Sequence, residues 1–270
     1  MSAPAVETAA APRVSSWRVF MALLARDARV TRRELPSFLI RTTLQPILFT
    51  TVFGFLLPKM GMVQGFYTAS LLPGIIAISL TLASLQAVAL PMVTDFGFTG
   101  EIEDRLLAPV PIELVAHEKM VAGIAQGVLA ALFVLPLARL IMGPVPGLTL
   151  VHLGSVLAVA LLGAAAFSAI GLVLGTAIPP QQIGLMFSAI IAPMMFFGCA
   201  YYPWSGLDRV PAMKYAVLVN PLVYVSEGLR GTLTPDMPHM PLLAALAALA
   251  AIGAALWGLG IRTFVRRAMK

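Results

Sequence analysis

Charged side chains are scarce in this chain: they make up 11% of its 270 residues, whereas 59% are hydrophobic. Soluble domains carry about 25% charged residues, so this sequence has too little polar surface to coat a globule in water. Cysteine is almost absent, because Cys199 stands alone and excludes an internal disulfide framework. Three scattered histidines form no zinc-binding pattern, so we expect no metal. The composition predicts a protein that lies in a lipid bilayer.

The sequence also lacks the motifs of several enzyme classes. A nucleotide-binding loop places glycine directly before lysine, but the four lysines follow Pro58, Glu118, Met213 and Met269. The H-E-x-x-H pattern of membrane metalloproteases is missing as well. The middles of the apolar stretches contain no ionisable side chain of the kind that ion-coupled transporters use. We therefore predict that the chain is not an enzyme, and that any energy for transport comes from a partner.

Six apolar stretches are long enough to cross the bilayer as helices. A hydrocarbon core about 30 Å thick takes about 20 apolar residues in helical form. The runs also lack the strict alternation of a porin-like barrel. The predicted fold is therefore an all-α polytopic membrane protein with six transmembrane helices. They are expected at 38–57, 68–93, 120–142, 151–178, 183–201 and 242–265.

Positive charge gives the expected orientation. Thirteen of the eighteen lysines and arginines lie in the two terminal segments, in the connection after span two, or near the inner ends of spans one and six. The other five lie in the remaining connections or near the ends of spans that face them. Because cytoplasmic segments are enriched in lysine and arginine, the chain is expected to be a multi-pass protein of the cytoplasmic (inner) membrane. Both termini are then cytoplasmic.

We divide the chain into three parts. Residues 1–14 are rich in alanine and are expected to be disordered. Residues 15–37 are expected to form a cytoplasmic amphipathic helix at the membrane interface. Residues 38–270 form the predicted six-span domain, which contains an inner loop at 94–118 and an outer re-entrant segment at 202–241.

The N-terminal helix has two distinct faces. Trp17 and Phe20 belong to an apolar face with helical spacing, whereas Arg26, Arg29 and Arg33 lie on the other side. Such a helix lies flat on the membrane surface, held by anionic lipid. The same helix could instead offer a docking surface to a cytoplasmic partner, and the two roles are compatible.

The inner loop holds the densest charge in the chain. A short helix is expected there before the prolines at 109 and 111 end it. One interpretation is a solvated hairpin between two spans. Acidic side chains are repelled by anionic lipid, however, which favours an interpretation in which the loop contacts a protein. The residues concerned are Glu101, Glu103, Asp104, Arg105 and Leu106.

The outer segment contains two apolar patches, 212–218 and 222–225, that are too short to cross a bilayer. Each is expected to form a re-entrant or interfacial half-helix buried against the spans. Glu227 and Arg230 stand three residues apart in this segment, where an unpaired charge is costly. We predict that they form a mutual ion pair with a structural role.

Two pairs of glycines predict close contacts between helices. Gly123 and Gly127 lie four residues apart in the third predicted span, and Gly171 and Gly175 have the same spacing in the fourth. Small residues at this spacing let two membrane helices approach closely.

Three features together resemble the membrane subunit (permease) of type-2 ABC exporters, the group that includes daunorubicin-resistance, nodulation-factor and polysaccharide-export permeases. Residues 99–111, T-G-E-I-E-D-R-L-L-A-P-V-P, are similar to the coupling segment of that family. Residues 220–230, N-P-L-V-Y-V-S-E-G-L-R, are similar to its N-P-L-x-Y-x-x-x-x-L-R motif. The third feature is the amphipathic helix that leads into span one. The resemblance runs from about Trp17 to the C-terminus.

The resemblance implies a half-transporter. Two permease copies face each other, with a homodimer expected and a heterodimer as the alternative, and two cytoplasmic ABC ATPase subunits bind beneath them. ATP and Mg would be bound by those subunits, so this chain needs no cofactor of its own, and no nucleic acid is expected as a partner. ATPase coupling maps onto Glu101, Glu103, Asp104, Arg105 and Leu106. The interfacial helix would flank the same ATPase, through residues that include Trp17, Phe20, Arg26, Arg29 and Arg33.

The same resemblance gives the outer segment a role at the exit of the transport route. The residues concerned are Asn220, Pro221, Tyr224, Glu227 and Arg230. The substrate would be an amphipathic, lipid-linked, glycolipid or drug-like molecule that leaves the cytoplasm or the inner leaflet. The alternative function is a passive channel or a non-transporting membrane scaffold. A neighbouring reading frame that encodes a nucleotide-binding loop would favour the exporter.

Overall fold

The computed structural model of the chain describes residues 15–62, 65–99, 111–142 and 150–269. Within these ranges all regular structure is helical, in agreement with the predicted all-α fold. The elements are α1 (Ser16–Arg33), α2 (Leu35–Phe49), η1 (Thr50–Leu56), α3 (Leu57–Lys59), α4 (Gly65–Thr94), η2 (Asp95–Thr99), α6 (Ile112–Met142), α7 (Leu150–Ala177), η3 (Pro180–Gln182), α8 (Ile183–Met186), η4 (Phe187–Ile191), α9 (Ala192–Phe196), η5 (Trp204–Arg209), α10 (Pro211–Ala216), η6 (Val217–Val219), α11 (Pro221–Leu233) and α12 (Leu242–Ala268).

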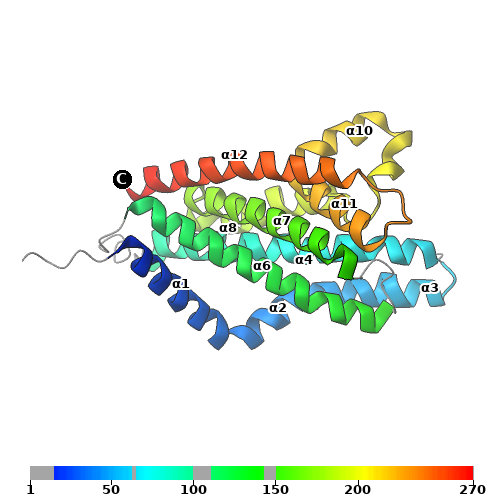
Figure 1. Cartoon of the computed structure of the whole chain (residues 1–270), viewed down its shortest axis with the longest axis horizontal. Coiled ribbons are helices and arrows are strands. Elements are labelled where there is room, and N and C mark those ends of the chain that lie inside the picture. Colours follow the sequence, from blue (N-terminus) through cyan, green and yellow to red (C-terminus); the bar gives the residue numbers. More distant parts are fainter. Residues whose placement is uncertain (1–14, 63–64, 100–110, 143–149, 270) are drawn as a thin grey trace, which may run out of the picture.

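Four long helices, α4, α6, α7 and α12, run side by side along the longest axis of the molecule (Figure 1). Helix α4 lies in the core, because every residue from Ser70 to Thr81 is buried. Its sequence is apolar on all sides, and a helix of that kind needs partners or lipid around its whole circumference. Helices α6 and α7 supply those partners within the chain.

Five helical segments in the described ranges are long and apolar enough to cross a membrane. They are Leu35–Lys59, Ser70–Gly97, Ile112–Ile141, His152–Ala177 and Leu242–Ala268. At the predicted fifth span, 183–201, the chain forms a shorter apolar helix, Pro180–Phe196. This helix ends at Phe196, because Phe197 leaves helical geometry with φ −91° and ψ 11° and Cys199 has a positive φ of 52°. The chain is thus an all-α polytopic membrane protein, and the count of six spans stays a prediction.

The predicted interfacial helix is shorter than expected. It was placed at 15–37, but α1 ends at Arg33 and a second helix, α2, begins at Leu35 in a different direction (Figure 1). Pro36 explains the break, because it has no backbone N–H to continue the ladder of α1 and fits the first turn of a new helix. Residues 1–14, which were expected to be disordered, lie outside the described residues.

The inner connection is also shorter than the predicted loop at 94–118. Helix α4 reaches Thr94, η2 follows, and α6 begins at Ile112, so residues 112–118 are helical. Val115 and Ala116 are fully buried and pack in one cluster with Phe264 of α12. This packing explains why α6 begins at Ile112, before the predicted start of the span at residue 120. The sequence did not indicate this longer helix, because the charged residues Glu113 and Glu118 interrupt the apolar run there.

Both predicted glycine pairs lie at close contacts with α4. A β-carbon placed on Gly127 of α6 would lie 1.8 Å from Ser84 Oγ, and one on Gly171 of α7 would lie 2.5 Å from the carbonyl oxygen of Leu85. Neither position has room for a larger side chain without a shift of its neighbours. The glycines therefore set the distance of α6 and α7 from α4, as the spacing predicted.

Candidate functional site

The candidate functional residues lie at two opposite ends of the bundle. The first residues of α1 and α6 and the last residues of α12 lie at one end, here called the α1 end (Figure 1). Helices α10 and α11 lie toward the opposite end, here called the α10 end. The predicted ATPase-coupling residues connect η2 to α6, both at the α1 end. These residues, Glu101, Glu103, Asp104, Arg105 and Leu106, lie outside the described part of the chain.

Helix α1 presents an open surface. Trp17 is 67% exposed and stacks on Phe20 with ring centroids 5.6 Å apart. Arg26, Arg29 and Arg33 are exposed, as the amphipathic pattern predicted, and Arg29 Nε donates a hydrogen bond to a backbone oxygen of the same helix. No residue of α1 is fully buried within the chain. The helix can therefore contact lipid with its apolar face and a partner with its arginines.

Two polar contacts join α1 to α6, and neither was predicted from the sequence. Lys119 forms an ion pair with Asp27, and Gln126 Nε2 donates a hydrogen bond to Thr31 Oγ1 over 3.2 Å. Lys119 is 4% exposed. Asp27 is the single acidic residue in α1, beside five arginines, and Lys119 is the single lysine in α6. The one acidic residue of α1 and the one lysine of α6 were the signal that could have predicted the pair.

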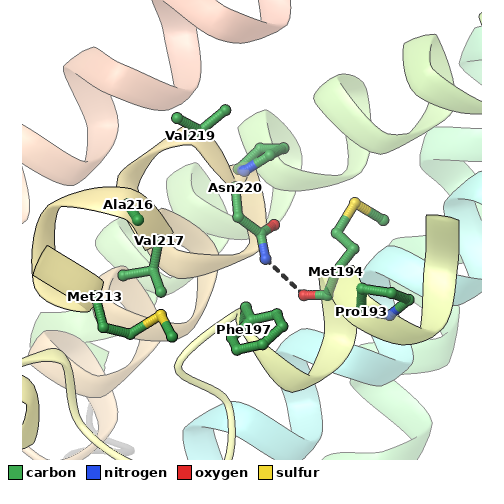
Figure 2. A pocket seen from close by; sticks show the side chains of 9 residues that line it. Pro193, Met194, Phe197, Met213, Ala216, Val217, Val219 and Asn220 are labelled. Carbon is green, nitrogen blue, oxygen red and sulfur yellow. Dashed lines mark hydrogen bonds between the residues drawn. The ribbon is translucent and has the colours of Figure 1, made fainter. Parts of the chain in front are cut away.

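At the α10 end, the Asn220-Pro221 motif begins helix α11. Asn220 caps the helix, since its Oδ1 accepts a hydrogen bond from the backbone N–H of Leu222 at 3.0 Å. Its Nδ2 donates to the carbonyl oxygen of Met194 at 2.6 Å, as Figure 2 shows. Pro221 occupies the first helical position, where its missing N–H costs nothing. Tyr224 extends this anchorage, because its hydroxyl donates to the backbone oxygen of residue 218 at 2.8 Å.

Glu227 and Arg230 form the predicted ion pair, with both side chains fully buried. The Glu227 carboxylate also accepts hydrogen bonds from the backbone N–H groups of Trp204 and Met240, each at 2.9 Å. Burial lowers the pKa of the Arg230 guanidinium, and the charge of Glu227 opposes that shift.

Arg230 also reaches backbone groups of distant segments. Its Nη2 atom donates to the carbonyl oxygens of Cys199, at 3.0 Å, and Ser70, at 3.3 Å. Together the two charged side chains hold α11, α4, the turn after α9 and the chain before α12 in one arrangement. This network agrees with the structural role that was predicted for the Glu227–Arg230 pair.

The two predicted half-helices of the outer segment differ in burial. Helix α11 is buried along most of its length, as expected. Helix α10 is mostly exposed, with Tyr215 at 68%, although the apolar patch 212–218 was expected to be buried against the spans. The difference arises because α10 packs mainly on η5 and η6, which precede and follow it, rather than on the long helices.

An apolar pocket of about 370 Å³ lies between α9 and the turn formed by α10 and η6 (Figure 2). Its walls include Met194, Phe197, Met213 and Val217. Asn220 is a polar residue in the wall, but both ends of its amide are engaged in the hydrogen bonds described above. The pocket therefore suits hydrocarbon rather than a polar group.

The thiol of Cys199 should be unreactive in the folded protein. Its side chain is fully buried next to the Glu227–Arg230 network, and it is the only cysteine of the chain. A maleimide dye in mild detergent should label the folded protein at least about a hundredfold more slowly than the unfolded protein, because labelling requires local opening. Equal labelling rates before and after unfolding would contradict the burial of this side chain.

Comparison with known proteins agrees with these features. A family model described as ABC-2 type transporter matches residues 18–234. The inner membrane transport permease YadH of Escherichia coli is 26% identical over 227 residues, which cover 79% of this chain and 82% of that protein. YadH of Shigella flexneri matches with the same identity and coverage. The matched region extends from α1 to the end of α11, so it contains both motifs. The chain belongs to the ABC-2 type transporter family.

Proposed function

We propose that this chain is the membrane subunit of an ATP-driven exporter, energised by separate ATPase subunits that bind at the α1 end. Membership of the family makes the chain a multi-pass transmembrane subunit of an inner-membrane transporter that associates with an ABC ATPase. Outward direction, coupling to ATP hydrolysis, and a complex of two permease copies with two ATPase subunits are parts of the proposal.

One observation carries the proposal: the segments that we propose to contact the ATPase begin or end at the same end of the molecule, the α1 end. Helix α1 with its exposed arginines, the two flanks of the acidic segment 100–110, and the end of α12 lie together there (Figure 1). The chain offers no glycine-lysine loop of its own. A mechanical link is then sufficient, because a partner shifts a conformational equilibrium through contacts that differ between two states.

The substrate that we propose is amphipathic: lipid-linked, glycolipid or drug-like. Support comes from the apolar pocket at the α10 end, whose single amide is already engaged (Figure 2). A surface of this kind attracts the hydrocarbon part of an amphiphile and offers nothing to a free sugar or ion. With both termini in the cytoplasm, the pocket would lie on the outer side of the membrane, where the substrate leaves.

Charge reversal in the acidic segment tests the coupling. In proteoliposomes that contain this chain and its ATPase, Glu103→Lys/Asp104→Lys should lower ATP-dependent export of a fluorescent amphiphile by about tenfold or more, a size typical of lost coupling between sites. The reason is repulsion at the surface where the ATPase would bind. Membrane insertion and thermal stability should not change. The matched control is Asp236→Lys, an exposed acidic position at the other end of the protein.

Three results would contradict the proposal. If export survives the double reversal at the wild-type rate, the segment 100–110 does not couple this chain to an ATPase. If the wild-type chain moves the amphiphile equally well without ATP, the chain acts as a passive channel. The absence of any movement, with or without ATP, would favour a scaffold.

A further inference from the structure

The contact between α1 and α6 is narrow and polar. The ion pair between Asp27 and Lys119 lies one helical turn along α1 from the hydrogen bond between Thr31 and Gln126. Lys119 Nζ also lies 4.0 Å from the neighbouring carboxylate of Glu118. Both charges of the pair are largely withdrawn from solvent, because the side chains of Lys119 and Asp27 are 5% and 16% exposed.

Cavities flank this contact on both sides. One, of about 460 Å³, has mostly apolar walls that include Leu24, Val121 and Leu129. The other, of about 530 Å³, is half polar and lies between α1, α4 and α6, with Gln86 in its wall. Asp27, Thr31 and Gln126 line both cavities. Close packing is therefore limited around the contact, and the polar groups between the cavities hold α1 against the bundle.

The helical path breaks directly after α1. Glu34 separates α1 from α2 with φ −93° and ψ 5°, outside helical geometry, and Pro36 prevents the two helices from merging. Helix α1 is thus attached to the bundle at two places: a break in the chain at Glu34 and the polar contact with α6. A rotation of α1 about this break would have to separate the polar contact with α6.

We propose that the Asp27–Lys119 pair makes α1 and the first turns of α6 move as one rigid body, with Glu34 as the hinge. Helix α6 begins just after segment 100–110, where we propose that the ATPase pushes. The transmission of movement from the ATPase to α1 therefore rests on the proposed function. A movement that enters α6 at Ile112 is passed to α1 through the pair. Asp27 and Lys119 are then positioning residues: they contact neither substrate nor ATP.

The link that the Asp27–Lys119 pair makes between α1 and α6 is here called the clamp. It can be tested on the chain alone in lipid nanodiscs, by hydrogen exchange of the α1 amides. Lys119→Met keeps the length and removes the charge, so exchange across 16–33 should become at least about tenfold faster as α1 opens from the bundle. Lys119→Arg keeps the charge and should exchange within about threefold of wild type. The control is Lys214→Met, which removes the cation of the more exposed Lys214–Asp208 pair at the α10 end. Unchanged exchange in Lys119→Met would overturn the clamp.

The transmission of movement from α6 to α1 is tested with the complete transporter in proteoliposomes. Asp27→Cys/Lys119→Cys removes both charges and should lower export per ATP hydrolysed by about tenfold. A short bifunctional thiol reagent that bridges the two cysteines should restore export to within about threefold of wild type, because a covalent link replaces the ion pair. Both positions line the cavity of about 530 Å³, through which the reagent reaches the new thiols, whereas Cys199 is fully buried and does not compete.

Two outcomes of this experiment would overturn the rigid-body proposal. One is a bridged variant that exports no better than the unbridged one, which would mean that α1 must move against α6. The other is an unbridged variant with wild-type export. A wild-type chain that shows no ATP-dependent export at all would contradict the proposed function instead, and the hydrogen-exchange result would still decide whether the clamp exists.

Discussion

We expect Glu227→Ala to lower the stability of this protein by about 3–5 kcal/mol, because it leaves the buried guanidinium of Arg230 without its carboxylate. The variant also removes the acceptor of two backbone N–H groups, those of Trp204 and Met240. Buried donors that lose their acceptor carry a desolvation cost of their own. The expected loss is large because one side chain serves three partners from three separate segments.

The buried cysteine provides the measurement. A thiol-reactive dye reports unfolding of this chain through Cys199, so the melting temperature can be followed in detergent without a further label. Glu227→Ala should melt at a clearly lower temperature than wild type. The control is Lys214→Ala, which removes the cation of a pair whose aspartate is 62% exposed and should cost less than about 1 kcal/mol. Equal melting temperatures for Glu227→Ala and Lys214→Ala would mean that the hydrogen bonds and the ion pair of Glu227 do not stabilise the packing of α11 against its neighbours.

A second variant separates the pair from its backbone contacts. Glu227→Ala/Arg230→Ala should lose less stability than the two single variants added together, because the double variant leaves no unpaired buried charge. Strict additivity would show that the two side chains act independently. The stability would then come from their separate bonds to backbone groups.

The sequence predicted the helices well where apolar length alone decides. The all-α fold and the approximate positions of five long apolar segments follow from local patterns, because the length of an apolar run decides whether it can span the bilayer. The region 183–201 shows the limit of that reasoning. Its composition is as apolar as a span, but composition does not reveal that the helix ends at Phe196, where the backbone turns through Phe197.

The partners of buried charges were the least predictable feature. The spacing of Glu227 and Arg230 predicted their ion pair, because residues three apart share a helix face. Their backbone partners at Ser70 and Cys199 come from other parts of the chain, and no local pattern points to them. Asp27 and Lys119 are 92 positions apart and lie on two helices whose contact depends on the fold. The sequence shows that Asp27 is the one acidic residue of its helix, but not which charge it meets.

A small change at the α4–α7 contact should have the second large effect. We expect Gly171→Ala to destabilise the protein by about 1–3 kcal/mol, because the new methyl group would lie 2.5 Å from the backbone oxygen of Leu85. A backbone oxygen cannot turn aside as a flexible side chain can, so α7 must move away from α4. The close contact of Gly175 with α4, one helical turn further along α7, would be lost in the same movement.

The same helix offers the matched control, since a β-carbon on Gly154 of α7 would meet no atom within 4 Å. Gly154→Ala should leave stability unchanged or raise it by about 0.4–1 kcal/mol, because alanine restricts the unfolded chain more than glycine does. Melting of the two variants with the dye on Cys199 compares the same substitution at both positions. If Gly171→Ala melts as Gly154→Ala does, the distance between α4 and α7 is not set by this glycine. A lower melting temperature for Gly171→Ala alone would show that α4 and α7 pack most tightly where Gly171 faces the backbone oxygen of Leu85, an atom that cannot move aside.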